Sequence, residues 1–302
     1  MIKIKAWLNA ARLRTLPLSV SGVVTGTAIA NLYQSNNYHI FLLALLTTIA
    51  FQVTSNFAND YGDGVKGTDN EDRIGPKRAM QSGLLSRSEL KTGIFVSIII
   101  SLVLVVSLIY TAFGTENLVM ILVFFLLGLL SIWAAIKYTV GESAYGYRGF
   151  GDVFVFVFFG VVAVLGTLFI FTKTITWSAL LPAISIGALS TGVLNLNNLR
   201  DFESDKKVGK NTVIVKIGKH RGKIYHYALL CVSFLCIIGF LIVNANAALQ
   251  YLPLLAFVPI MVHFRKVQTI KDPKSFDHEL KKLALSTFLL AVLMFISCNI
   301  FL

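Results

Sequence analysis

The chain has 302 residues, of which 56% are apolar and only 14% are charged, against roughly 25% charged residues in soluble globular proteins. This composition excludes an ordinary soluble domain. The net charge of +12 does not indicate a nucleic-acid partner, because the basic residues are not interleaved with aromatic residues on polar segments.

Nine apolar stretches are long enough to cross a bilayer, which takes roughly 17–25 helical residues. No polar linker divides them, so we predict an all-α integral membrane protein with nine transmembrane helices and a single domain over residues 1–302. In chain order, the predicted spans are residues 15–33, 40–59, 93–113, 118–136, 151–172, 177–198, 225–243, 248–264 and 283–302.

The connectors between these spans alternate in length and charge. The short, nearly uncharged connectors lie near residues 34–39, 114–117, 173–176 and 244–247, and the long, charged ones are residues 60–92, 137–150, 199–224 and 265–282. The N-terminal segment and the long connectors hold every Lys and Arg except Lys173. The positive-inside rule therefore predicts a cytoplasmic N-terminus, cytoplasmic long loops and a C-terminus outside.

The first long connector carries an acidic motif that begins inside the second span. It reads QVTSNFANDYGDGVKGTDNEDRIGPKRAMQ over residues 52–81. If the helix continues into it, Asn56, Asp60 and Asp63 lie at positions i, i+4 and i+7 and share one face. Carboxylates at the end of a membrane-length helix are costly unless a cation holds them. The remaining acidic residues of the motif are Asp69, Glu71 and Asp72.

A second motif, NLNNLRDFESDKKVGKNT over residues 195–212, repeats this arrangement after the sixth span. Here Asn198, Asp201 and Asp205 take the corresponding places, and we expect them to share one helix face as well. Both motifs fall on the predicted cytoplasmic side. We therefore interpret them as the two halves of one metal and diphosphate site.

Mg²⁺ prefers oxygen ligands and is commonly held by one or two carboxylates together with substrate phosphates. The predicted metal ligands are Asp60, Asp63, Asp69, Asp201 and Asp205. Neutral amide oxygens that add to the site or orient its carboxylates are predicted at Asn56, Asn59 and Asn198. Basic side chains that neutralise a diphosphate are predicted at Lys66, Arg73, Lys77, Arg78, Arg200 and Lys206.

Other polar and aromatic residues have ordinary interpretations. We expect the scattered histidines to lie at the membrane interface, and Glu89, Asp272, Asp277 and Glu279 to solvate the surface. Lipid contact or core packing is favoured over a substrate groove for the Phe-rich fifth span, FGDVFVFVFFG. The stretch with Tyr145, Tyr147 and Arg148 is either part of the site or an interfacial aromatic belt. No GxxxxGK[ST] loop occurs, which disfavours nucleotide-type phosphoryl transfer.

The two Asp-rich motifs and the nine spans resemble the UbiA superfamily of intramembrane prenyltransferases, over essentially the whole chain. Within it, NDYGDGVKGTDNEDRIGPKR, YGYRGFGDVFVFVFFG, NNLRD and GKNTVIVKIGKHRG resemble the branch that acts on 1,4-dihydroxy-2-naphthoate. Other branches often carry YxxKD in the second motif, where Asn197 and Arg200 stand here. The stretch GESAYGYRG departs from the Gly-Pro-rich lead of many relatives.

The resemblance implies an Mg²⁺-dependent enzyme of a bacterial inner membrane with its active site on the cytoplasmic side. Such an enzyme transfers a polyprenyl group from polyprenyl diphosphate to 1,4-dihydroxy-2-naphthoate through an allylic carbocation, with loss of diphosphate and CO₂, and gives demethylmenaquinol. The implied catalytic residues are Asp60, Asp63, Asp201, Asp205, Tyr147 and Arg148. Two alternatives stay open: a different aromatic or glycerol-phosphate acceptor, and a transporter whose cation sites use the paired acids.

Overall fold

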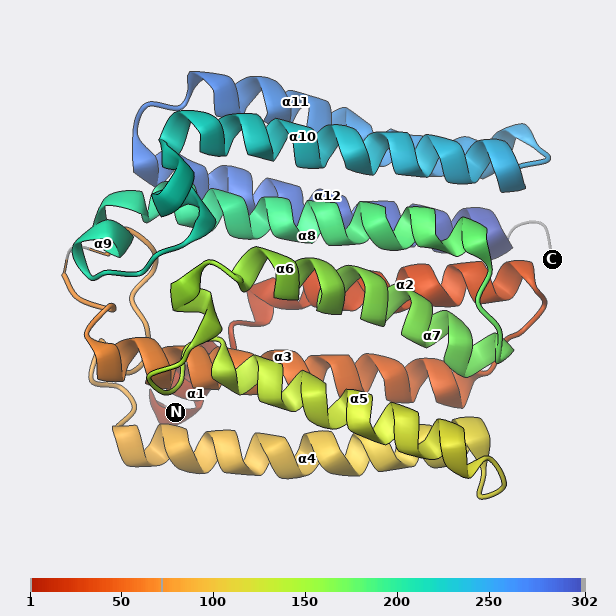
Figure 1. Ribbon diagram of the computed structural model, residues 1–302, viewed down its shortest axis with the longest axis horizontal. Coiled ribbons are helices and arrows are strands. Elements are labelled where there is room, and N and C mark those ends of the chain that lie inside the picture. The colour runs from red at the N-terminus through yellow and green to blue at the C-terminus, as the bar shows by residue number, and fades with distance from the viewer. Residues whose placement is uncertain (1, 72, 300–302) are drawn as a thin grey trace.

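The computed structural model describes residues 2–71 and 73–299, and within these ranges the chain is helical and contains no strand. Its long helices run side by side in one bundle (Figure 1). In the described part of the chain, nine helical segments are long and apolar enough to cross a membrane. The prediction of an all-α protein with nine membrane-spanning helices is therefore confirmed. Asp72 of the first acidic motif and the last three residues of the ninth predicted span lie outside the described residues.

Twelve α-helices are described, and short 3₁₀ or π-helical segments extend some of them. They are α1 (Ile2–Ala11), α2 (Leu16–Leu32), α3 (Tyr38–Lys66), α4 (Arg87–Phe113), α5 (Leu118–Lys137), α6 (Gly151–Val155), α7 (Ala163–Thr172), α8 (Leu180–Arg200), α9 (Phe202–Lys207), α10 (Val213–Asn244), α11 (Phe257–Thr269) and α12 (Phe276–Asn299). A π-helical segment, Phe156–Val162, joins α6 to α7, and a 3₁₀ segment, Ala248–Ala256, precedes α11.

Several helices extend beyond the spans predicted from hydropathy. At 1.5 Å per residue the 29 residues of α3 reach about 43 Å, whereas the hydrocarbon core is about 30 Å thick. Likewise, α10 begins at Val213 and α12 at Phe276, well before the predicted starts of the seventh and ninth spans. The charged connectors are thus partly helical, and α3 is longer than a bilayer crossing requires and holds the first acids of the motif on its last turns.

The first span is broken near its start. Arg12 adopts a left-handed conformation (φ 49°, ψ 54°) between α1 and α2, which is uncommon for a residue with a side chain. The carbonyl oxygen of Ala11 at this break accepts a hydrogen bond from Nδ2 of Asn56, at 2.8 Å. The same amide nitrogen lies 3.3 Å from Oγ1 of Thr15. An α3 side chain therefore satisfies the backbone of the interrupted helix.

Close helix contacts hold the bundle together around α2, α7 and α8. A Cβ added to Gly26 would lie 2.5 Å from the carbonyl oxygen of Val164, and one added to Gly160 would lie 2.6 Å from Cα of Gly187. Such approach is possible only where side chains are absent, as is common between membrane helices. The packed interior continues into α10, α11 and α12, which pack against α8 or against one another.

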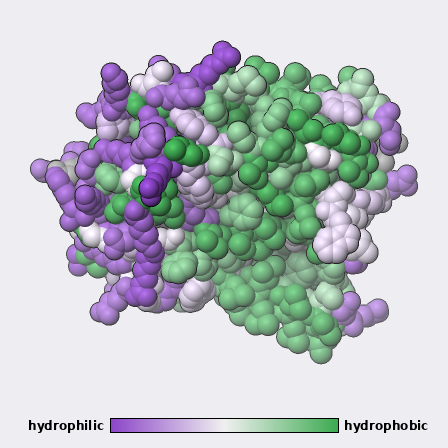
Figure 2. All heavy atoms as spheres, turned by 45° about the horizontal axis from the view of Figure 1, so that its top comes forward, coloured by the Kyte–Doolittle hydropathy of each residue, from purple (hydrophilic) through white to green (hydrophobic). Residues whose placement is uncertain are grey.

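Polar and apolar surfaces are separated along the bundle. Figure 2 shows hydrophilic side chains gathered over one end and a broad hydrophobic surface over most of the remainder. That polar end holds the C-terminal end of α3 and the short helix α9 (Figure 1). Both acidic motifs accordingly lie at the same end of the bundle.

Candidate active site

Two acids of the first motif lie on the last turns of α3, on one buried face as predicted. Asp60 is only 1% exposed, and its carboxylate accepts hydrogen bonds from the backbone amides of Ala79 (3.1 Å) and Met80 (3.3 Å). Asp63 accepts a hydrogen bond from the hydroxyl of Tyr147 at 2.7 Å. It also forms an ion pair with Arg78 at 2.9 Å. Asp60 therefore fastens the connector to the helix, and Asp63 joins it to a second loop.

Beyond α3 the chain reverses direction at Gly67, which caps the helix in the left-handed conformation (φ 71°) that glycine adopts readily. This turn brings Asp69 into ion pairs with Arg73 (3.0 Å) and Arg78 (3.1 Å). Burial raises the pKa of Asp69 above its usual value, although the charge of Arg78 acts in the opposite direction. The first motif is thus a network of carboxylates and arginines.

The second motif does not form one continuous helix face, contrary to the expectation. Helix α8 ends at Arg200, Asp201 is the junction residue (φ −93°, ψ 9°), and α9 begins at Phe202. Arg200 donates two hydrogen bonds to Asp201, at 2.9 and 2.7 Å, and one at 2.7 Å to Asp277 at the start of α12. Burial acts to raise the pKa of Asp201, but these bonds and the charge of Arg200 hold it below its usual value.

Asp205, on α9, is neutralised less completely. Its Oδ1 lies 3.5 Å from Nζ of Lys210, and its buried Oδ2 has no hydrogen-bond partner among the described residues. Burial raises the pKa of Asp205 to about 6 despite the opposing charge of Lys210. A buried carboxylate oxygen without a donor can accept a cation.

The two motifs meet through their basic and aromatic residues. Nζ of Lys210 lies 5.5 Å from the ring centroid of Tyr147, whose hydroxyl bonds Asp63. In addition, a Cβ added to Gly75 would lie 2.7 Å from Nη2 of Arg200, so the first connector abuts the end of α8. The structure thereby brings together Asp63, Tyr147, Arg200 and residues of both acidic motifs.

A cavity of about 840 Å³ opens beside this meeting point and extends into the bundle between α2, α3, α5 and the α6–α7 segment. Charged residues line its mouth and apolar residues line most of its depth. The charged lining residues are Arg12, Arg14, Asp60, Asp63, Arg73, Lys77, Arg78, Arg200, Lys210, Asp277 and Lys281. Cations outnumber acids in this set, so the mouth suits an anionic group.

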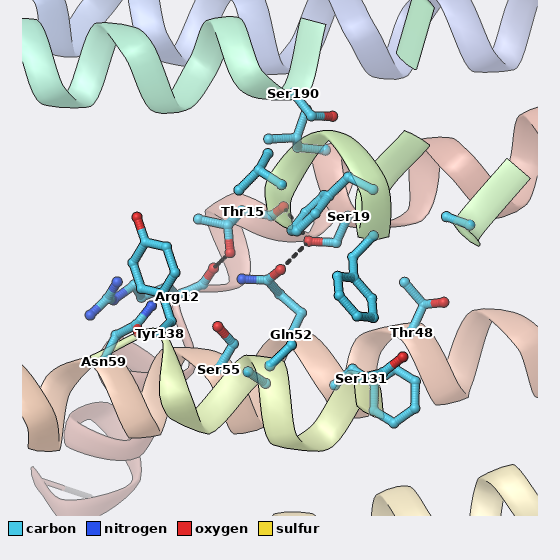
Figure 3. Close-up of a pocket in the computed structure, with 18 of the residues that line it drawn as sticks. Arg12, Thr15, Ser19, Thr48, Gln52, Ser55, Asn59, Ser131, Tyr138 and Ser190 are labelled. Atoms are coloured by element: carbon cyan, nitrogen blue, oxygen red, sulfur yellow. Dashed lines mark hydrogen bonds between the residues drawn. The ribbon is translucent and has the colours of Figure 1, made fainter. Parts of the chain in front are cut away.

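One wall inside the mouth is polar (Figure 3). Gln52 of α3 accepts a hydrogen bond from Ser19 of α2 at 2.7 Å and donates one to Asn56 at 3.0 Å. Thr15 donates to the carbonyl oxygen of Arg12 at 2.9 Å. In the same part of the chain, Nη2 of Arg12 is buried without a hydrogen-bond partner among the described residues. These polar groups can form hydrogen bonds with a ligand that enters the cavity between the helices.

The Phe-rich fifth span was expected to contact lipid or pack in the core, and this expectation is wrong for Phe154 and Phe158, which line the cavity. Phe159 packs against the core as expected and also reaches the cavity lining. Phe154 also stacks on Tyr145, with ring centroids 3.9 Å apart, and Tyr145 lines the cavity as well. The span therefore provides an aromatic wall.

Some predicted site residues lie apart from the cavity lining. Asn56 is used in the α1–α2 break, and Asn198 is buried without lining the cavity. Lys66, Arg148 and Lys206 are exposed. Nζ of Lys66 lies over the Tyr147 ring, 3.9 Å from its centroid, while the backbone carbonyl of Arg148 accepts a hydrogen bond from Lys216. Asn59 does line the cavity, and its side chain accepts a hydrogen bond from Thr139.

The sequence reasoning missed four residues at the mouth. Lys210 was passed over in favour of Lys206, although its place in GKNT beside the second motif was a usable signal. Asn197 accepts a hydrogen bond from Arg200 at 2.7 Å, and Arg12 points into the cavity from a helix break that no pattern indicated. Asp277, expected to solvate the surface, is an ion-pair partner of Arg200 instead.

A buried series of hydrogen-bonded side chains lies outside the cavity lining and corrects three further expectations. His226 and His263 are fully buried and their Nε2 atoms are 2.9 Å apart, so neither is interfacial. His263 bonds Glu279 through Nδ1 at 2.7 Å, and Glu279 is 2% exposed where surface solvation was expected. This series ties α10, α11 and α12 together.

The sequence profile of the UbiA prenyltransferase family matches residues 19–298. The chain belongs to the UbiA prenyltransferase family. A relative from Haemophilus influenzae, named 1,4-dihydroxy-2-naphthoate octaprenyltransferase, is 43% identical over 96% of this chain and 94% of its own length. A relative of the same name from Escherichia coli is 40% identical over 96% of this chain and 94% of its own length.

The family fold is also found among solved structures. A UbiA homolog from Archaeoglobus fulgidus bound to DMAPP and Mg²⁺ superimposes with a TM-score of 0.64, at 13% identity, over 95% of this chain and 99% of that chain. At this identity the likeness concerns the fold. The family is thus one of multi-pass membrane proteins with members that bind a prenyl diphosphate and a divalent metal ion.

Proposed function

We propose that this protein transfers a polyprenyl group from polyprenyl diphosphate to 1,4-dihydroxy-2-naphthoate, with release of diphosphate and CO₂, to give demethylmenaquinol for menaquinone biosynthesis. The reaction takes place at the cytoplasmic face of a bacterial inner membrane, with the N-terminus on that side and the C-terminus outside. The excess of Lys and Arg at the polar end of the bundle supports this orientation.

One observation supports the proposal most directly. Two motifs, each with acidic and basic residues, meet at the mouth of a cavity that is otherwise lined mainly by apolar residues. A prenyl diphosphate has the same division, with a charged head and a hydrocarbon tail. A volume of about 840 Å³ is in the ~300–1,000 Å³ range of small-molecule sites. The names of the 37–43% identical relatives supply the acceptor and the reaction.

The donor set fits a divalent metal ion, which we propose to be Mg²⁺. Asp60 and Asp63 line the mouth, while Asp69, Asp201 and Asp205 lie outside its lining and are joined to it through ion pairs with Arg78, Arg200 and Lys210. Asp205 has a buried carboxylate oxygen with no hydrogen-bond partner among the described residues. Among the described residues, no three Asp, Glu, His or Cys side chains converge on one point, so phosphate oxygens and water would complete the coordination. The residues that would hold the metal are Asp60, Asp63, Asp69, Asp201 and Asp205. Bound there, Mg²⁺ would neutralise charge on the departing diphosphate.

The basic residues of the mouth perform the remaining electrostatic work. Arg73, Arg78, Arg200 and Lys210 bind the diphosphate and stabilise it as the C1–O bond breaks and the electron pair leaves with oxygen. Burial lowers the pKa of Lys210, but the charges of Asp205 and Asp63 outweigh it and hold the pKa above its usual value, so the side chain remains an ammonium.

Aromatic side chains line the path of the resulting allylic cation. Tyr138, Tyr145, Phe154 and Phe158 face the cavity, exclude water and offer cation–π contact. Tyr147 has a different place, because its hydroxyl bonds Asp63 and its ring carries Lys66. We assign Tyr147 the role of orienting Asp63.

The acceptor is placed against the polar wall formed by Ser19, Gln52 and Arg12. Its hydroxyl groups find hydrogen-bond partners there, and its carboxylate meets a buried guanidinium nitrogen. The ring carbon that bears the carboxylate attacks C1 of the donor, and the new C–C bond forms. The bond to the carboxylate then breaks, its electron pair returns to the ring, and CO₂ leaves without any external oxidant.

The test is a reconstituted reaction. Purified protein in lipid vesicles receives Mg²⁺, polyprenyl diphosphate and carboxyl-labelled 1,4-dihydroxy-2-naphthoate, and mass spectrometry follows the prenylated quinol while trapping follows labelled CO₂. We expect both products in equal amounts, and neither after chelation of divalent ions. Parallel reactions receive 4-hydroxybenzoate or glycerol phosphate as acceptor. Preferential turnover of either one, or full activity in the chelator, would overturn the proposal.

A further inference from the structure

One glycine in the membrane region has no packing role. Gly22, Gly26, Gly160 and Gly187 each permit a close helix contact that an added Cβ would obstruct. Gly166, in the middle of α7, is different: among the described glycines inside helices whose backbone angles are helical, it is the one whose added Cβ would meet nothing within 4 Å. A mid-helix glycine destabilises a helix relative to alanine, and no close helix contact requires a glycine at position 166.

The open space beside Gly166 belongs to the cavity. Gly166 is one of its lining residues, on the same wall as Phe158, Val162 and Ile170. These three neighbours along the wall carry large apolar side chains, whereas position 166 carries none. The wall therefore has a notch at this point, well beyond the charged mouth.

An aromatic cluster lies beyond the notch. Phe124, a lining residue of α5, stacks on Phe169 of α7 with ring centroids 5.6 Å apart, and Phe113 of α4 lies 5.2 Å from Phe124. These contacts join α4, α5 and α7 one turn past Gly166. A hydrocarbon chain that extends from the mouth as far as this cluster passes the notch, where its isoprene units find open space.

We propose that Gly166 is a specificity-determining residue for donor chain length: its missing side chain admits the distal isoprene units of a long polyprenyl diphosphate. This inference rests on the proposed function, because it assumes that the cavity binds a prenyl donor with its diphosphate at the mouth. Short donors do not reach the notch and are therefore insensitive to what fills it. Long donors require it to be open.

The test compares chain-length profiles of three variants in vesicles with wild type. Gly166→Phe fills the notch, Gly166→Ala removes the backbone freedom of glycine and adds only one methyl group, and Leu126→Phe adds the same ring on an exposed face of α5. For each protein, kcat/KM is measured with prenyl diphosphates of increasing length, from the shortest that wild type uses up to octaprenyl diphosphate. Expression and thermal stability in detergent are recorded in parallel.

We expect Gly166→Phe to lower kcat/KM for octaprenyl diphosphate about tenfold or more relative to the shortest donor, as is typical of a steric change in an apolar pocket. Gly166→Ala and Leu126→Phe should keep the wild-type profile. An unchanged profile in Gly166→Phe, an equal loss for short and long donors in a folded variant, or the same shift in Gly166→Ala would overturn the inference. If wild type transfers no prenyl group at all, the proposed function fails instead.

Discussion

The two acidic motifs differ in how completely their carboxylates are already satisfied. In the first, Asp60 holds two backbone amides and Asp63 is bound by Tyr147 and Arg78, so each acid maintains a loop position. In the second, the helix breaks at Asp201, which Arg200 binds, whereas Asp205 retains a buried oxygen without a hydrogen-bond partner in the described part of the chain. Asp60 and Asp63 of the first motif are therefore already held by other protein groups, whereas Asp205 of the second motif has an oxygen that can still bind a ligand.

This difference makes Asp60→Ala the most damaging single change. Its removal leaves the amides of Ala79 and Met80 without their acceptor and takes a proposed metal ligand away. We expect kcat to fall by at least about a hundredfold, on the scale of losing one preorganised electrostatic contact, and the connector to become sensitive to protease. Asp60→Asn, which keeps one acceptor oxygen, should restore protease resistance but not turnover. A protected connector in Asp60→Ala would contradict the anchoring role.

Asp205→Asn should act on metal dependence more than on structure. Among the described residues, no backbone amide donates a hydrogen bond to this side chain that would fasten a loop, and burial already disfavours its charge. We expect the Mg²⁺ concentration for half-maximal rate to rise about tenfold or more, while the melting temperature stays level or increases. Titration of Mg²⁺ in the transfer assay, together with a thermal melt, checks both. A wild-type Mg²⁺ requirement would remove Asp205 from the metal site.

The smallest of these effects separates two lysines of the second motif. Lys210 lines the mouth near Asp205, whereas Lys206 is exposed. We expect Lys210→Met to raise KM for the prenyl diphosphate about tenfold, the scale of one charge-assisted hydrogen bond. Lys206→Met should stay within about twofold, as is typical of an exposed charge. Equal effects of the two variants would contradict the difference in placement.

The sequence was sufficient for what depends on regular spacing. The prediction that Asn56, Asp60 and Asp63 share one helix face is confirmed. It holds because α3 continues without a break, so that helical periodicity fixes the direction of these side chains. The nine spans followed from apolar length, which the bilayer imposes. The prediction of one helix face in the second motif was wrong at Asp201, because residue spacing does not reveal where a helix ends.

Residues placed by tertiary contacts could not be predicted in this way. Hydropathy averaged over a span hides a buried pair such as His226 and His263, whose partners come from other helices. Lys206 and Lys210 look alike in a basic connector, and only the turn after α9 separates their environments. From the sequence, Phe158 was expected to face lipid or pack in the core, because composition does not indicate which side of a helix borders a cavity.

The contact between Gly160 and Gly187 has a consequence for how this protein can change. Neither glycine lines the cavity, and their contact sets the distance between the π-helical segment and α8. A single methyl group inserted there would act as a spacer and displace the phenylalanines toward the opposite helices. The width of the cavity can thus be changed by residues that do not line it.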